Sequence, residues 1–190
     1  MPRTEEKNRE IKEQTRAKII EASLKTFSQK GYQAASISQI AAEAGMAKGA
    51  LYHYFKNKEE LLKVVILKGM EDIMGMMVVD ENMAPKERFV AMLDLTFSSI
   101  ETNKEYWQLY TGLISQTQSI PVVKQIFTPY FQEMIEGFIQ LLTEMGVENP
   151  GEEAYIIGGM IDGIILQCLF VFEDYPIEKV KQNIIRKYAG

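Results

Sequence analysis

The chain has 190 residues, of which 46% are hydrophobic and 25% charged, a composition typical of one or two soluble globular domains. A single cysteine, Cys168, excludes an internal disulfide framework, and a single histidine, His53, argues against a histidine-based zinc or iron centre. We therefore expect no metal and no cofactor. Residues 1–18 are rich in charge and lack the apolar core of a signal peptide, which indicates a cytoplasmic protein.

The net charge of −5 is unevenly distributed along the chain. Residues 1–60 carry 11 Lys and Arg against 8 Asp and Glu, whereas residues 61–190 carry 10 against 18. A basic end on an acidic body suggests that the N-terminal part meets an anionic partner. An ordinary solvated surface is an equally good explanation of this charge pattern taken alone.

Apolar residues recur with helical spacing through the N-terminal part. After a disordered tail (residues 1–9), a first helix is predicted from Ile11 to Lys30, ended by Gly31. A short helix follows over 37–44 with Ser36 as its N-cap, and Gly45 breaks it. Another short helix covers 48–54. Asn57 and Glu60 then form a predicted capping box that opens a helix reaching about Val78.

The second half begins after the polar segment 79–84, where Pro85 is placed to start a helix. Five helices are predicted between breaks rich in Pro, Gly and polar residues: 85–102, 104–117, 121–145, 152–173 and 177–189. No segment alternates as a strand does. The sequence therefore predicts an all-α protein of about nine helices.

The segment 155–172 is the most apolar part of the chain, so a membrane span has to be considered. Its length is at the lower end for crossing a bilayer, it contains Asp162 and Gln167, and no basic cluster flanks it. A helix that is apolar all round is otherwise covered by protein. We expect a buried helix and no contact with a membrane.

Two short helices joined by a glycine turn, at about 35–54, predict a helix-turn-helix. Apolar and small residues face inward in both helices: Ile37, Ile40, Ala41, Ala44, Ala47, Leu51 and Phe55. The second helix of such a unit can enter the DNA major groove.

The residues left outside fit contact with DNA. Lys48 can reach a base edge or a phosphate, and Gly49 allows close backbone approach. Tyr52 and His53 combine polar tips with flat apolar bodies, which suits phosphates or thymine methyl groups. Ser36 lies at a helix N-terminus that favours phosphate, and Lys58 begins the next helix, from which it can clamp the DNA backbone.

Over about residues 14–67 the chain resembles the TetR family of bacterial transcriptional regulators. The resemblance lies in four segments, FSQKGY at 27–32, the Ser36 to Gly45 helix and turn, KGALYHYF at 48–55 and KEEL at 58–61. In that family, residues matching Tyr52 and Lys58 bind phosphates, and residues matching Lys48, Gly49 and His53 approach bases. The chain departs from the family pattern at Ala47, where a capping Ser is frequent, and at Tyr54, where His is frequent.

The resemblance implies a DNA-binding domain at 10–56, a connecting helix at 57–78 and a ligand-binding and dimerisation domain at 79–190. Aromatic and Met side chains at helical spacing independently suggest a partly apolar pocket for a flat or elongated molecule. The candidate ligand-binding residues are Trp107, Tyr110, Phe127, Phe131, Met134, Phe138 and Asp162. For each of these residues taken singly, a filled core is the better explanation, and Asp162 could instead face a subunit boundary.

Dimerisation has a physical motive in the 152–173 helix. Gly158, Gly159 and Gly163 would let another helix approach closely, and so apolar a helix needs more cover than one monomer supplies. We predict a two-fold interface made by the last two long helices. It would present two recognition helices to a pseudo-palindromic DNA operator with half-sites about 34 Å, or a multiple of that, apart.

The favoured interpretation is a homodimeric, ligand-responsive transcriptional regulator, a repressor rather than an activator, released from double-stranded operator DNA by an apolar or amphipathic effector. It is not predicted to be an enzyme, because no carboxylate–His set, Ser–His arrangement or phosphate-binding glycine loop is present. The alternative is a helical ligand-binding or scaffolding protein that does not bind DNA.

Overall fold

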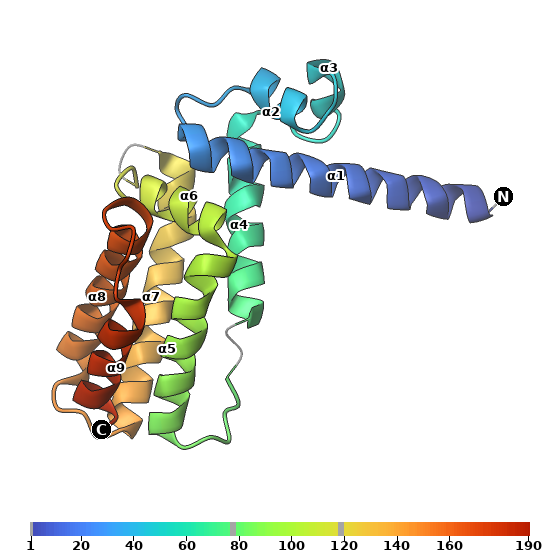
Figure 1. Cartoon of the computed structure of the whole chain (residues 1–190). Helices are drawn as coiled ribbons and strands as arrows, with labels where there is room; N and C mark the ends of the chain where they lie inside the picture. The colour runs from blue at the N-terminus through green and yellow to red at the C-terminus, as the bar shows by residue number, and fades with distance from the viewer. Residues whose placement is uncertain (1, 77–78, 118–119) are drawn as a thin grey trace.

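The computed structural model describes residues 2–76, 79–117 and 120–190, and these form nine helices and no strand (Figure 1). The helices are α1 (Pro2–Lys30), α2 (Ile37–Glu43), α3 (Lys48–Leu51), α4 (Lys58–Met76), α5 (Pro85–Thr102), α6 (Lys104–Ile114), α7 (Pro121–Glu144), α8 (Pro150–Phe170) and α9 (Ile177–Tyr188). The predicted all-α class is confirmed. The predicted end of the fourth helix near Val78 lies outside the described residues.

The first helix differs most from its prediction. α1 begins at Pro2 rather than Ile11, and residues expected as a disordered tail continue the helix away from the rest of the molecule (Figure 1). The side chains of residues 5–14 are exposed, so no apolar face marks this part in the sequence. Helix propensity, not burial, is the only signal for this extension, and it is a weak one.

Helices α1 to α4 share a small core at one end of the molecule. Ile19, Phe27, Ile40, Leu51 and Leu62 are all at most 1% exposed, and they come from all four helices. Each such Leu or Phe contributes about 1.5–3 kcal/mol on leaving water. This core fixes α3 against α1, α2 and α4.

Helix α4 runs from this end along the C-terminal bundle (Figure 1). Its Gly69 faces the ring of Tyr106 on α6 so closely that a Cβ atom at Gly69 would lie 2.0 Å from Tyr106 Cδ2. Helix α1 also packs against α6. The two halves of the molecule therefore meet chiefly through α6.

Helices α5 to α9 form the C-terminal bundle, and specific polar contacts link some of them. The indole Nε1 of Trp107 donates to Ser99 Oγ at 3.1 Å, which links α6 to α5. Lys181 on α9 pairs with Asp94 on α5 at 2.5 Å. The bundle is thus closed by apolar packing and by a few specific polar links.

Helix α8 is only partly buried. It is the one described helix long and apolar enough to cross a membrane, yet only 28% of its most apolar window is buried. Its outer side exposes Tyr155, Ile156, Leu166 and Phe170. Within one chain α8 is therefore not covered on every side, as expected of a helix that needs more cover than one monomer supplies.

Candidate nucleic-acid interface and effector cavities

The first helix of the helix-turn-helix is fixed by its N-cap. Ser36 Oγ accepts from the backbone N–H of Gln39 at 3.3 Å, and Gln39 Oε1 accepts from the N–H of Ser36 at 3.0 Å. These reciprocal bonds satisfy two donors that a helix start leaves unpaired. The prediction of Ser36 as N-cap is confirmed, and its neighbours Ile37 and Ile40 are buried as predicted.

Gly45 makes the turn into α3 with φ +69°, a left-handed conformation that glycine adopts without strain. Leu51 and Phe55 then point into the core, at 0% and 2% exposure, as predicted. Ala47 was expected inside but is exposed, because it lies before the first turn of α3 in extended conformation. It supplies no side-chain cap, and α3 ends at Leu51 rather than at residue 54.

The four side chains expected outside on α3 and its C-terminal turn are all exposed: Lys48, Gly49, Tyr52 and His53. The large aromatic side chain of Tyr52 is 47% exposed to solvent. Because Leu51 and Phe55 anchor the same few residues from behind, the outer set is held on a rigid support.

Lys58 occupies a position that its sequence does not reveal. Its Nζ donates to the carbonyl oxygens of Tyr32, Gln33 and Ala35 at 2.8, 3.3 and 3.0 Å. It also lies 4.4 Å from the centroid of the Tyr32 ring. Burial lowers the pKa of this amine. An ammonium group has three donors, so a phosphate could bind here only by replacing one of these bonds.

Two cavities flank α7 in the C-terminal bundle. We call the first the α7–α8 cavity. It has a volume of about 680 Å³, within the range usual for small-molecule sites, and includes four predicted ligand residues, Phe127, Phe131, Met134 and Asp162. Its other lining side chains include Ile135, Glu136, Ile139 and Tyr155. These α7 and α8 residues thus adjoin one space, and their role in binding a ligand remains a prediction.

Asp162 faces this cavity, which settles its place within one chain. Its Oδ1 accepts a hydrogen bond from the Tyr110 hydroxyl at 2.9 Å. Burial raises the pKa of the carboxyl, and the bond from Tyr110 opposes this shift. Burial and then the charge of Asp162 likewise raise the pKa of the Tyr130 hydroxyl. The carboxylate is therefore partly buried and bonded to the neutral hydroxyl of Tyr110.

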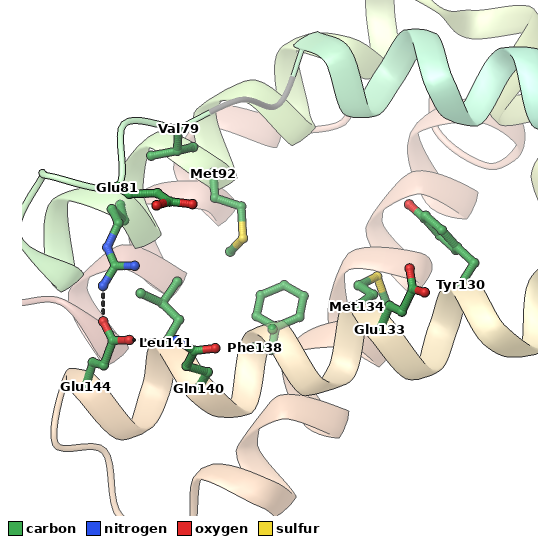
Figure 2. Close-up of a pocket in the computed structure, with 12 residues that line it drawn as sticks. Val79, Glu81, Met92, Tyr130, Glu133, Met134, Phe138, Gln140, Leu141 and Glu144 are labelled. Atoms are coloured by element: carbon green, nitrogen blue, oxygen red, sulfur yellow. Dashed lines mark hydrogen bonds and ion pairs between the residues drawn. The ribbon is translucent and has the colours of Figure 1, made fainter.

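The second space, the α5–α7 cavity, has a volume of about 730 Å³. Figure 2 shows Glu144 at one end of it and Tyr130 with Glu133 at the other. Met134 and Phe138 are the predicted residues that line it, so Met134 borders both cavities. Arg88, the one basic residue in its lining, forms an ion pair with Glu144.

Two predicted ligand residues, Trp107 and Tyr110, line neither cavity and are each 6% exposed. They belong to an aromatic cluster, in which the Tyr110 ring lies 5.4 Å from Trp107 and 5.5 Å from Phe127. Trp107 and Tyr110 therefore pack behind the residues that line the cavities. Sequence reasoning missed Arg88, Tyr130, Glu136 and Tyr155, because a helix pattern does not say which polar residues turn toward a gap.

Known proteins resemble this chain both in the sequence of its helix-turn-helix and in its fold. The model of the bacterial regulatory proteins of the tetR family matches residues 19–65. YuxN of Bacillus subtilis, described as an uncharacterized HTH-type transcriptional regulator, is 28% identical over 160 residues. That match covers 80% of this chain and 54% of YuxN, so the chain spans about half the length of this relative.

Solved structures share the whole fold. A transcriptional regulator from Saccharomonospora viridis in complex with choline has a TM-score of 0.81 at 16% identity, covering 93% of this chain and 95% of that one. FadR from Bacillus subtilis in complex with stearoyl-CoA has a TM-score of 0.72 at 20% identity, covering 90% and 95%. The ordered motif and the family match agree that residues 19–65 are similar to the bacterial regulatory proteins of the tetR family, and the whole chain shares its fold with solved transcriptional regulators.

Proposed function

We propose that the protein is a cytoplasmic, homodimeric repressor that binds operator DNA through α3 and is released by a small amphipathic effector. The observation that carries this proposal is the outer surface of the helix-turn-helix. Lys48, Gly49, Tyr52 and His53 are exposed together, while Leu51 and Phe55 fix the same segment from behind. A rigid convex element with such side chains fits the major groove.

Each contact residue has a distinct role in this proposal. Lys48 and His53 approach base edges, and Gly49 allows the backbone to come close. Tyr52 donates its hydroxyl to a phosphate, and the start of α2 at Ser36 presents backbone N–H groups to another. Lys58 supports this surface from behind, because its ammonium holds the connection between α1 and α2.

The dimer proposal rests on the uncovered side of α8. Ile156, Gly159, Gly163, Leu166 and Phe170 recur at alternating spacings of three and four residues. Such spacing produces one straight seam on a helix, as in packed helix pairs. Ile156, Leu166 and Phe170 on it are 46%, 47% and 57% exposed. Gly158 faces α7 of the same chain instead, so it is not part of this seam.

The effector would act by favouring one of two dimer arrangements. The cavities on both sides of α7 offer the binding space, and the bundle contacts α1 through α6 and α4 through α7. An effector shifts DNA affinity only if it binds the two arrangements differently. The choline and stearoyl-CoA in the structural neighbours support an effector role for the bundle but differ in chemistry.

A gel-shift assay with double-stranded DNA from upstream of the gene tests the DNA-binding proposal. We expect Tyr52→Ala and Lys48→Ala each to weaken binding about tenfold. Affinity should also fall steeply between about 50 and 200 mM salt. Lys104→Ala removes an exposed charge from α6 and serves as the matched control. A protein that dimerises yet ignores DNA at low salt would instead be the ligand-binding or scaffolding protein of the alternative interpretation.

A further inference from the structure

The α7–α8 cavity combines apolar walls with unbalanced negative charge. Its lining includes two carboxylates, Glu136 and Asp162, and contains no Lys, Arg or His among the residues described there. Phe127, Phe131 and Met134 supply an apolar side to the same space. A guest that fits both features is apolar along its length and positive at one end.

Within this cavity, Asp162 is the carboxylate that a bound cation would stabilise most. Its one hydrogen-bond donor in the described part of the chain is the neutral hydroxyl of Tyr110, and no ion pair involves it there. A carboxylate that loses water without gaining a positive partner is costly. Burial accordingly raises the pKa of this carboxyl. A bound ammonium group would offset that cost.

Phe127 and Phe131 line the same cavity as Asp162, and the ring of Tyr110, whose hydroxyl bonds the carboxylate, packs against both of them. Tyr110 lies 5.5 Å from Phe127 and 6.2 Å from Phe131, centroid to centroid, and Tyr130 lies 6.0 Å from Phe131. The negative faces of aromatic rings attract organic cations, and quaternary ammonium groups are bound in this way. The rings and the carboxylate thus favour the same sign of charge.

We propose that the effector is an amphipathic organic cation, with its ammonium group beside Asp162 and its apolar part along Phe127, Phe131 and Met134. This assignment deepens the effector role in the proposed function and rests on it. An anionic amphiphile would place its negative group among carboxylates.

The neighbouring α5–α7 cavity offers an anion no better position. Its single basic residue, Arg88, forms an ion pair with Glu144 through one terminal guanidinium nitrogen, while its buried Nε has no hydrogen-bond partner in the described part of the chain. Glu81 and Glu133 add further negative charge to the lining (Figure 2), so carboxylates outnumber the one guanidinium there. Residues 61–190 carry 18 acidic against 10 basic side chains, so the surrounding field also favours cations. Both cavities therefore select the same sign of charge.

Three probes of equal chain length test the sign of the charge: decyltrimethylammonium, decanol and decanoate, each below its aggregation limit. Binding to the DNA-free full chain is measured by titration calorimetry. Fluorescence of the single tryptophan, Trp107, whose ring lies 5.4 Å from Tyr110, provides a second readout. We expect the cation to bind at least about tenfold more tightly than decanoate. Equal binding, tighter binding of decanoate, or no binding of the cation would overturn the proposal.

Matched variants locate the cation. Asp162→Asn keeps an acceptor for Tyr110 and should weaken decyltrimethylammonium about tenfold while leaving decanol unchanged. Glu148→Gln, an exposed carboxylate outside both cavities, should change neither. Unchanged cation affinity in Asp162→Asn contradicts the site. The three-probe comparison on the unmodified chain does not depend on how any variant folds. DNA binding of the ligand-free protein is assayed separately, so failure of the proposed function is distinguished from failure of this assignment.

Discussion

At the scale of single residues, two charged side chains, Lys58 and Asp162, lie in surroundings that have opposite effects on stability. The ammonium of Lys58 is satisfied by three backbone carbonyls, whereas the carboxylate of Asp162 has only a neutral hydroxyl. The first arrangement stabilises the fold. The second costs stability, which is the pattern expected where a group is kept for binding.

Lys58→Met should therefore lower the free energy of unfolding by about 1–3 kcal/mol, the usual contribution of hydrogen bonds to a charged group. Thermal or urea unfolding measures this loss, with Lys56→Met as an exposed neighbouring control. Because the amine has no free donor, the salt dependence of DNA affinity should keep its slope. A slope reduced by about one, with stability unchanged, would instead identify a direct phosphate contact.

Asp162→Asn should raise the melting temperature at pH 7. The folded protein raises the pKa of this carboxyl, so folding disfavours its ionised form, and the amide removes that cost. The advantage of the variant should shrink as the pH falls through the raised pKa, because protonation then removes the same cost in the unmodified protein. Melting curves across this pH range provide the measurement. A variant less stable at pH 7 would show that the carboxylate supports the fold.

At the scale of elements, the packing of α1 on α6 and of α4 on α7 joins the helix-turn-helix end to the bundle, and one close contact between α4 and α6 adds to it. Gly69 permits this contact, since any β-carbon would overlap the Tyr106 ring. Tyr106 is 7% exposed and adjoins the aromatic cluster, with its ring 5.7 Å from Trp107. Movement at the cavities can therefore reach α4 through packed side chains.

Gly69→Ala should destabilise the protein by about 1–3 kcal/mol, because overpacking outweighs the gain in helix propensity. Gly112→Ala is the matched control within α6, where an added β-carbon meets nothing within 4 Å. That control should gain up to about 1 kcal/mol. Chemical unfolding of both variants measures these changes in the free energy of unfolding. Equal stabilisation by the two substitutions would contradict the close packing of α4 on α6.

At the scale of the whole molecule, the exposed seam of α8 is the proposed contact between two copies of the chain. The α7–α8 cavity borders this side of the helix, since Tyr155 and Gly159 belong to its lining and are themselves exposed. A guest beside Asp162 would thus lie close to the proposed dimer contact. That placement offers a short physical route from effector binding to the spacing of the recognition helices.

Leu166→Glu should convert the dimer to a monomer, because it places a charge in the apolar seam. Light scattering after size-exclusion chromatography measures the mass. Ser98→Glu, at an exposed position on α5, is the control. DNA affinity should fall together with dimerisation, since one recognition helix alone loses the second half-site. A dimeric Leu166→Glu protein would move the interface away from α8.

Much of this protein was determined by its sequence, because the signals concerned are local. Helix periodicity, the cap at Ser36, the left-handed turn at Gly45 and the outer set on α3 each depend on residues within a few positions of one another. Only the tertiary structure decided that Lys58 turns back onto three carbonyls and that Asp162 meets Tyr110 across 52 positions. These features depend on which helices become neighbours, and helix periodicity fixes the face of each helix but not its partner.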